Sequence, residues 1–167
     1  MSNIVVIAHN MRSTHNIGSL FRTADGFGVQ CIGLSGYTAY PMMAEDPRLP
    51  HIARKLDAQI HKTALGAEQT VKWKKFDDLE SAINHFRKAG YTIVALEQDK
   101  NSTAINKYGV DRNAKIALVL GTERDGLSKE ELVLCDDIVE IPMHGLKESF
   151  NVVQAAAIAL YALSNND

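Results

Sequence analysis

Short apolar runs of strand length alternate with helical patterns along this chain of 167 residues, and the alternation limits the folds that are open to it. The predicted strands cover residues 4–8, 30–34, 71–76, 92–96, 116–120 and 138–142. Several are almost continuous in Val, Ile and Leu, which is typical of parallel strands with helices on both faces. We therefore predict an α/β fold with an open, mostly parallel sheet and helices on both of its faces.

The helical segments have start signals of their own. From Asn16 onward apolar residues recur on one helix face, while Arg22 projects from the opposite side. Two capping-box pairs predict later helix starts, and they are Asp77 with Glu80 and Ser128 with Glu131. Residues 37–70 carry three prolines and predict a long connection with a short helix near 52–56. A connection of that length in a compact domain is usually functional.

Length and composition indicate one ordinary globular domain over residues 1–167. Hydrophobic residues make up 46% and charged residues 23%, which excludes intrinsic disorder and coiled coil. No apolar run is long enough to cross a bilayer, and the N-terminus predicts a first strand, so we expect a cytoplasmic protein that contacts no membrane. Cys31 and Cys135 lie far apart without a C-x-x-C partner, so we expect neither a disulfide framework nor a metal site.

Charge is unevenly distributed, although the formal net charge is only −2. Residues 1–75 carry nine basic and five acidic side chains, whereas residues 76–167 carry nine basic and fifteen acidic ones. A basic half can present a positive face to a polyanion such as nucleic acid. An ordinary solvated surface would show the same pattern, so the charge alone does not decide between the two interpretations.

Ligands of an open parallel sheet bind at the carboxyl ends of its strands, which selects four loops. These loops cover residues 8–18, 97–102, 121–128 and 143–151. They contain neither G-x-G-x-x-G nor a P-loop, so the predicted ligand has no pyrophosphate. Gly121, Gly126 and Gly145 lie in two of the loops, where a backbone without side chains can approach an adenine or ribose. Glycines are equally expected at these positions for the turn conformation alone.

Polar residues of these loops, and of the helix that follows the first one, are the candidates for chemistry. They are Asn16, Arg22, Glu123, Arg124, Lys147, Glu148, Ser149 and Asn151. Simpler structural roles compete with catalytic ones: Asn16 and Ser149 as helix N-caps, and Arg22 paired with Asp25. The sequence shows no Ser/His/Asp order and no metal-ligand spacing among its histidines.

Taken together, three ordered segments resemble the motifs of the SpoU/TrmH family of RNA ribose 2′-O-methyltransferases, in the SPOUT superfamily. They are NIGSLFRTADGFG at 16–28, LVLGTERDGLS at 118–128 and IPMHGLKESFNVVQAAAIALY at 141–161. The segment KTALGAE at 62–68 is also similar to a stretch found in that family. One departure is Val153, which stands where a second serine is common, and it affects local packing or hydrogen bonding to the substrate.

The resemblance implies a C-terminal trefoil knot that binds S-adenosylmethionine, with no metal required. It implies cofactor contacts through the backbone at Leu96, Gly121, Ile141 and Phe150, and we add Gly126 because a glycine there permits close approach of the backbone to the cofactor. The catalytic residues that it implies are Arg22, Asn16, Glu123, Ser149 and Asn151. Arg22 would accept the proton of the ribose hydroxyl or hold the adjacent phosphate, Asn16 and Glu123 would orient it, and Ser149 and Asn151 would shape the third loop.

An enzyme of this family without an appended RNA-binding domain suggests a small structured substrate, so we expect tRNA in preference to rRNA. Phosphate contacts are expected from basic residues of the first half, namely Arg12, Arg48, Arg54, Lys55 and Lys62. A homodimer is expected because residues 152–163 are apolar on nearly every helix face, more than one sheet can cover. The alternatives are a catalytically silent RNA-binding module that retains the fold and the cofactor pocket, and a nicotinamide-dependent enzyme, which the absence of G-x-G-x-x-G disfavours.

Overall fold

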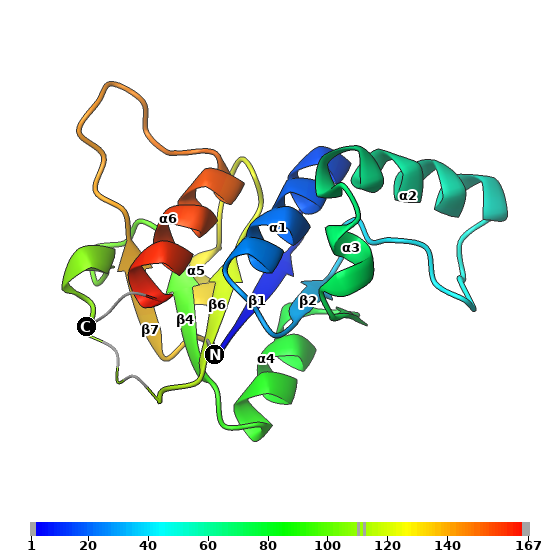
Figure 1. The fold of residues 1–167 in the computed structure, drawn as a ribbon. Coiled ribbons are helices and arrows are strands. Elements are labelled where there is room, and N and C mark those ends of the chain that lie inside the picture. Colours follow the sequence, from blue (N-terminus) through cyan, green and yellow to red (C-terminus); the bar gives the residue numbers. More distant parts are fainter. Residues whose placement is uncertain (1–2, 110, 112, 165–167) are drawn as a thin grey trace.

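A seven-stranded parallel sheet forms the centre of the molecule in the computed structural model, which describes residues 3–109, 111 and 113–164 (Figure 1). The strands are β1 (Ile4–His9), β2 (Ile32–Ser35), β3 (Trp73–Phe76), β4 (Thr92–Leu96), β5 (Thr103–Ala104), β6 (Ile116–Leu120) and β7 (Asp137–Glu140). Their order across the sheet of the described residues is β3-β2-β1-β6-β4-β7-β5. The adjacent strands β1 and β6 pair from Ile4 with Ile116 to Ala8 with Leu120, and both strands are buried. An open parallel α/β sheet is thus confirmed.

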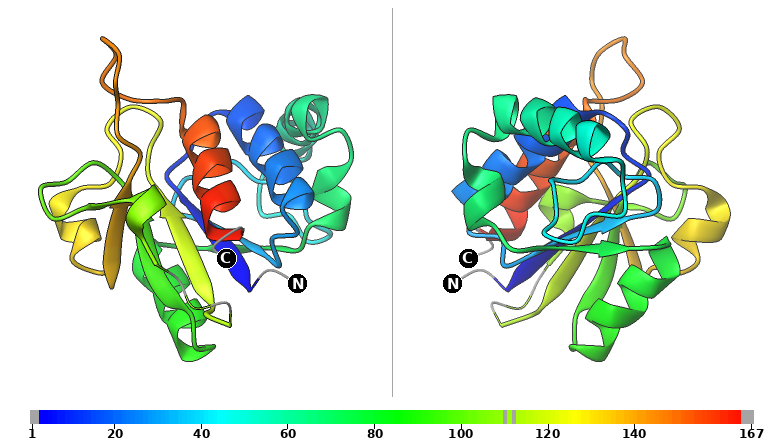
Figure 2. Two further views of the ribbon diagram at one scale, coloured as in Figure 1. Left: turned by 60° about the vertical axis from the view of Figure 1, so that its left-hand side comes forward. Right: turned by 90° about the vertical axis from the view of Figure 1, so that its right-hand side faces the viewer.

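Helices cover both faces of the sheet, as Figure 2 shows. One layer holds α1 (Thr14–Gly26), α2 (Pro50–Ala64), α3 (Ala67–Thr70) and α6 (Val152–Ser164), and the other holds α4 (Leu79–Lys88) and α5 (Lys129–Leu132). A single turn of 3₁₀ helix, η1 (Ile105–Lys107), follows β5. Successive side chains of a strand point to opposite faces, so Val6 and Ala8 pack under the first layer while Val5 and Ile7 pack under the second.

Strand positions agree with the sequence predictions, and two strands match them residue for residue, at 92–96 and 116–120. The two-residue strand β5 was not predicted, because such a short segment has no periodicity to detect. No helix among the described residues is both long enough and apolar enough to span a membrane.

The connection over residues 37–70 is more helical than predicted. Instead of a short helix near 52–56, α2 runs for fifteen residues and begins with Pro50 in its first turn. Its buried residues are only Ala53, Ile60 and Ala64, too sparse a stripe to reveal the helix in the sequence. The helix is held by packing along α1, where the Thr63 hydroxyl donates to the carbonyl of His15 at 2.9 Å.

Of the two predicted capping boxes one is confirmed, and the alternative roles of Asn16 and Ser149 as helix N-caps do not hold. Ser13 caps α1 and accepts from the Asn16 amide, so Asn16 is not the cap. Asp78 caps α4 rather than Asp77, through the amide of Ser81. The capping box of Ser128 with Glu131 at α5 is confirmed.

At α6 the capping side chain belongs to Asn151 and not to Ser149, the residue that the sequence suggested. The Asn151 Oδ1 atom accepts from the amide of Val153 at 2.9 Å and from that of Gln154 at 3.4 Å. Ser149 is therefore not the N-cap of α6, and it lies two residues before the cap.

Candidate active site

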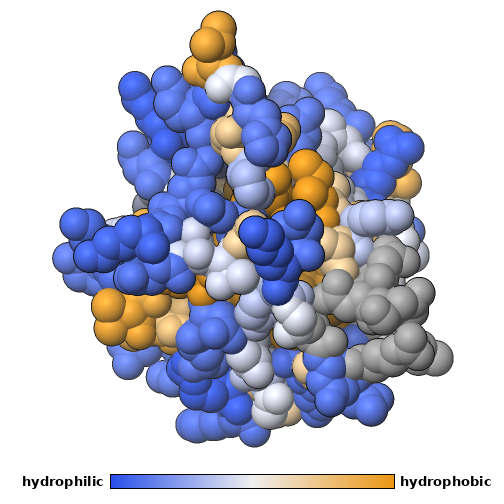
Figure 3. All heavy atoms as spheres, turned by 90° about the vertical axis from the view of Figure 1, so that its left-hand side faces the viewer, coloured by the Kyte–Doolittle hydropathy of each residue, from blue (hydrophilic) through white to orange (hydrophobic). Residues whose placement is uncertain are grey.

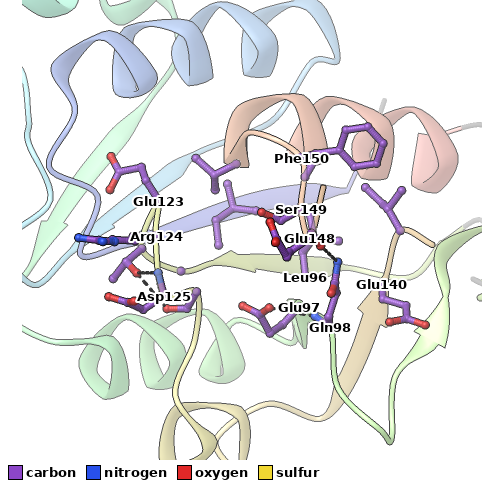
Figure 4. Close-up of a pocket in the computed structure, with 17 residues that line it drawn as sticks. Leu96, Glu97, Gln98, Glu123, Arg124, Asp125, Glu140, Glu148, Ser149 and Phe150 are labelled. Atoms are coloured by element: carbon purple, nitrogen blue, oxygen red, sulfur yellow. Dashed lines mark hydrogen bonds between the residues drawn. The ribbon is translucent and has the colours of Figure 1, made fainter. Parts of the chain in front are cut away.

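A cavity of about 250 Å³ opens at the carboxyl ends of β4, β6 and β7, the edge of the sheet at which the sequence predicted a ligand (Figure 4). Residues from three of the four selected loops line it, together with the start of α6. The lining residues are Leu96, Glu97, Gln98, Leu120, Gly121, Thr122, Glu123, Arg124, Asp125, Gly126, Glu140, Ile141, Glu148, Ser149, Phe150, Val152 and Ala155. All five predicted cofactor residues are among them.

The walls of this cavity combine apolar side chains with negative charge. Apolar groups come from every side, and they are Leu96, Leu120, Ile141, Phe150, Val152 and Ala155. The lining residues also include five carboxylates, Glu97, Glu123, Asp125, Glu140 and Glu148, against the single guanidinium of Arg124. Excess negative charge repels phosphate and attracts a cation. The cavity therefore suits a ligand with a flat apolar part and a positive charge.

The loop after β6 folds back on itself at the cavity. The amides and carbonyls of Thr122 and Gly126 exchange two hydrogen bonds of 3.2 and 3.3 Å. Gly126 has a φ of +67°, and a Cβ there would overlap the carboxylate of Glu97, while a Cβ at Gly121 would overlap the main chain of Gly126. Both glycines line the cavity, and each lies where a side chain would meet neighbouring atoms, Gly121 within its own loop and Gly126 against Glu97 of the loop after β4.

Glu97 braces this loop from the end of β4. Its Oε2 atom accepts from the amide of Leu127 at 2.9 Å, and its Oε1 atom accepts from the amide of Gln98 at 2.9 Å. Gln98 in turn donates its side-chain amide to the carbonyl of Glu148 at 2.8 Å (Figure 4). The strand-end loops are thus connected around the cavity. Glu97 and Gln98 were not singled out from the sequence, although their position directly after a predicted strand marked the loop that contains them.

Glu123 connects the cavity to the loop after β1. Its Oε1 atom accepts from the amide of Ser13 at 2.8 Å, and its Oε2 atom accepts from that of Arg12 at 3.4 Å. These partners lie more than a hundred residues away in the chain. The carboxylate is therefore held by the main chain before α1, and in the described residues it does not hold the guanidinium of Arg22.

Asn16 and Asn151 meet each other where α1 and α6 begin. The Nδ2 atom of Asn151 donates to the Oδ1 atom of Asn16 at 3.3 Å. Because Asn151 also caps α6, this contact fixes the first turn of α6 relative to α1. The two asparagines adjoin the cavity through Ser149 and Phe150, which do line it.

Arg22 lies apart from this cavity. It is exposed on α1 and lines a separate hollow with Ser19, Thr23, Lys62, Thr63 and Leu65. The alternative pairing with Asp25 is not favoured, since Asp25 accepts from the hydroxyl of Thr70 at 3.1 Å. Seven of the ten predicted site residues thus line the cavity, namely the five predicted cofactor residues with Glu123 and Ser149. Asn16 and Asn151 stand beside it, and Arg22 lines another hollow together with Lys62.

Arg48, one of the basic residues expected to contact phosphate, is used in folding the 37–49 segment. Its Nη2 atom lies 2.5 Å from the Asp46 carboxylate, and its guanidinium stacks 3.7 Å from the centre of the Tyr40 ring. This hydrogen-bonded pairing holds the pKa of Asp46 well below its usual range. With only 14% of its side chain exposed, Arg48 is not available to RNA.

His9 is buried at the end of β1. Its Nε2 atom lies 2.9 Å from Glu131, and its Nδ1 atom lies 2.9 Å from the hydroxyl of Ser35. Burial lowers the pKa of His9, against the opposing effect of Glu131. His9 therefore joins β1, β2 and α5 and does not face the cavity. No group of three or more His, Cys, Asp or Glu residues in the described chain is arranged to hold a metal ion.

Comparisons with known proteins agree with this architecture. The model of the SpoU rRNA Methylase family matches residues 3–161. The 23S rRNA (guanosine-2′-O-)-methyltransferase RlmB of Vibrio vulnificus is 28% identical over 160 residues, which are 96% of this chain and 58% of that protein. The tRNA (guanosine(18)-2′-O)-methyltransferase of Borreliella burgdorferi is 38% identical over 99 residues, 59% of this chain and 44% of that one. The chain thus spans about half the length of these relatives.

Solved structures show the same fold. The TrmH/SpoU tRNA modifying enzyme of A. aeolicus has a TM-score of 0.78 at 25% identity, covering 99% of this chain and 76% of its own. The AdoMet-bound rRNA methyltransferase of Sinorhizobium meliloti has a TM-score of 0.77 at 24% identity, covering 96% of this chain and 55% of its own. The trefoil knot is implied by this fold. With a family model matched over nearly the whole chain, the protein belongs to the SpoU rRNA Methylase family.

Proposed function

We propose that this protein transfers a methyl group from S-adenosylmethionine to a ribose 2′-hydroxyl of RNA, and that the described residues act as one methyltransferase domain. The observation that carries the proposal is the cavity at the ends of β4, β6 and β7, which is built from the second and third motifs of the family. The relatives named as tRNA and 23S rRNA methyltransferases support the reaction class.

The residues of the cavity fit S-adenosylmethionine. Leu96, Ile141 and Phe150 offer apolar surface for the adenine, and the surrounding carboxylates favour a ligand with a sulfonium and an ammonium group. The loops present main-chain donors and acceptors without a phosphate cradle, which suits a nucleoside that carries no phosphate. When bound, the cofactor supplies an electrophilic methyl group on sulfur.

The chain's own residues must position a ribose hydroxyl beside that methyl group and remove its proton. Ser149 lies in the cavity wall, where its hydroxyl can orient the ribose. Asn16 and Asn151 hold the third motif in place by their mutual hydrogen bond. Glu123 positions the loop before α1. These four residues therefore act on the geometry of the site.

We assign to Arg22 either the acceptance of that proton or the binding of the adjacent phosphate. Its hollow also contains Lys62, and two cations in one hollow suit a phosphate group. Within one chain, Arg22 lines a hollow that is separate from the cavity. A second copy that docks on α6 can place its Arg22 at the cavity of the first. A homodimer is therefore part of the proposal.

We favour tRNA over rRNA as the substrate, and we propose a cytoplasmic location. The test is methylation of unmodified tRNA and rRNA transcripts with radiolabelled S-adenosylmethionine, followed by mapping of 2′-O-methyl positions. Label in tRNA at one ribose supports the whole proposal, and label in rRNA alone corrects the substrate. Binding of RNA and cofactor without transfer would identify the catalytically silent RNA-binding module instead.

A further inference from the structure

Tyr37 and Arg12 form an exposed stacked pair beside the cavity. The guanidinium carbon of Arg12 lies 4.6 Å from the centre of the Tyr37 ring, and Tyr37 is 52% exposed. Arg12 is exposed as well. A large aromatic side chain with half its surface in water contributes little to the stability of the fold through burial. The pair therefore presents a flat, positively charged surface to the solvent.

The main chain beneath the pair is held rigidly. The amide of Tyr37 donates to the Oδ1 atom of Asn10 at 3.1 Å, next to Gly36, whose φ of +65° makes the turn. The buried hydroxyl of Thr38 donates to the carbonyl of Ala8 at 3.0 Å and accepts from the amide of Met11 at 3.1 Å. An exposed ring on such a fixed base loses little conformational entropy when it binds a ligand.

The pair is also fixed relative to the cavity. Glu123, which lines the cavity, accepts hydrogen bonds from the amides of Arg12 and Ser13. Tyr37 follows β2, which lies two strands from β6 across β1. At the usual spacing of strands, this separation is about 10 Å. One or two nucleotides of an RNA strand span that distance.

Other cations near this loop are engaged in the fold. The Lys75 ammonium donates to the carbonyls of Gly36 and Phe76, and Arg48 is paired with Asp46. The cavity itself is acidic, so the affinity for RNA has to come from outside it. Tyrosine rings and guanidinium planes are the groups on which proteins stack unpaired bases.

We propose that Tyr37, together with Arg12, is a stacking platform for an unpaired base that neighbours the methylated nucleotide. The proposal rests on the proposed RNA methyltransferase function and adds a site for the flanking nucleotide. It also predicts that the substrate is a loop or another single-stranded element, because a base inside a duplex has no free face. Stacking tolerates every base, so the platform contributes affinity and position more than sequence choice.

The test compares Tyr37→Leu, which keeps apolar volume, with Tyr37→Phe, which keeps the aromatic ring. The probes are tRNA transcripts and a single-stranded oligoribonucleotide that contains 2-aminopurine, whose fluorescence falls on stacking. We expect Tyr37→Leu to weaken RNA binding about tenfold and to abolish the fluorescence change, in line with the energy of one stacked base. Tyr37→Phe should bind like the wild type, and calorimetry should give the same S-adenosylmethionine affinity for all three proteins.

The salt dependence of binding separates stacking from simple charge attraction. Tyr37→Leu should leave the slope of log affinity against log salt unchanged, because no phosphate contact is lost. Arg12→Ala should weaken binding more than Lys88→Ala, a matched loss of one exposed charge at the end of α4. Wild-type affinity and fluorescence in Tyr37→Leu would overturn the platform alone. Failure of the wild-type protein to bind any RNA would overturn the proposed function and the platform together.

Discussion

At the scale of single residues, two carboxylates of the cavity act on the main chain. Glu97 holds the amides of Gln98 and Leu127, and Glu123 holds the amide of Ser13. Each satisfies backbone donors in the loops that follow the strands. The shape of the cavity therefore depends on side chains that need not touch the cofactor.

Replacing Gly126 by alanine should weaken cofactor binding by about tenfold or more. The new Cβ would overlap the Glu97 carboxylate that braces the loop, and the left-handed backbone adds strain of about 1–2 kcal/mol. Calorimetry with S-adenosylmethionine measures the effect. The matched control is Gly28→Ala, where φ is +63° and a Cβ would meet nothing within 4 Å. Equal affinities of both variants and the wild type would contradict this role of the loop.

Arg22→Ala should leave cofactor affinity unchanged and reduce methyl transfer on the order of 10²-fold or more, the usual loss for a positioned proton acceptor. Steady-state kinetics on tRNA transcripts provide the measurement, with Lys88→Ala, which removes one exposed positive charge at the end of α4, as the control. The split between KM and kcat in Arg22→Ala distinguishes the two roles assigned to Arg22. A raised KM for RNA with kcat retained indicates phosphate binding, and a lowered kcat with KM retained indicates proton acceptance. Near-normal turnover of Arg22→Ala would remove Arg22 from the mechanism.

At the scale of elements, the connection before α2 is ordered by one ion pair. Arg48 donates to the carbonyls of Tyr40 and Pro41 as well as to Asp46, so a single side chain ties together nine residues of the loop. The carboxylate of Asp46 also accepts from the amide of Met43 at 3.0 Å. This loop connects the stacking platform to α2, so its fixed conformation holds the platform and the helix in place relative to each other.

Asp46→Asn should lower the free energy of unfolding by about 1–3 kcal/mol at pH 7, because Arg48 loses a charged partner. The folded-state pKa of Asp46 is lowered, so its stabilisation is present above the unfolded pKa of about 3.9 and is lost as pH falls toward the folded pKa. The difference between wild type and variant should therefore shrink below pH 4. Urea unfolding at several pH values tests this, with exposed Glu45→Gln as the control that should behave like wild type.

At the scale of the whole molecule, α6 buries one side against the sheet and leaves another uncovered. Val153, Ala156 and Leu160 are buried, whereas Ile158 is 39% and Tyr161 is 64% exposed. Figure 3 shows a face of the molecule on which apolar patches lie among hydrophilic residues. A twofold-related copy is the commonest partner for such a surface in soluble oligomers. The uncovered side of α6 therefore supports the homodimer.

Ile158→Arg should convert the expected homodimer to a monomer, because a charge at the centre of an apolar interface remains unpaired. Light scattering at micromolar concentration measures the mass of both proteins. Val133→Arg is the control, since Val133 is 83% exposed at the end of α5 on the opposite layer. A wild-type monomer with full methyltransferase activity would exclude the dimer, and a dimer that survives Ile158→Arg would place the interface elsewhere.

The sequence by itself determined six of the seven strands, the layer architecture and the loops that line the cavity. Strands 92–96 and 116–120 were predicted to the residue because short, almost wholly apolar runs rich in Val, Ile and Leu are typical of buried parallel strands. The loops that line the cavity were selected because carboxyl ends of parallel strands share one edge of the sheet. These inferences need only local pattern and a general rule of topology, whereas Leu96, Gly121, Ile141 and Phe150 were named as cofactor contacts from the resemblance to the family.

Only the tertiary structure decided which polar groups meet. The contacts of Ser13 with Glu123 and of Asn16 with Asn151 join residues 110 and 135 positions apart, and no periodicity encodes them. The same holds for the strand order, for the length of α2 and for the separation of Arg22 from the cavity. Hydrogen bonds and close packing between distant segments set these features, because they depend on how the elements dock and not on the local preference of any one of them.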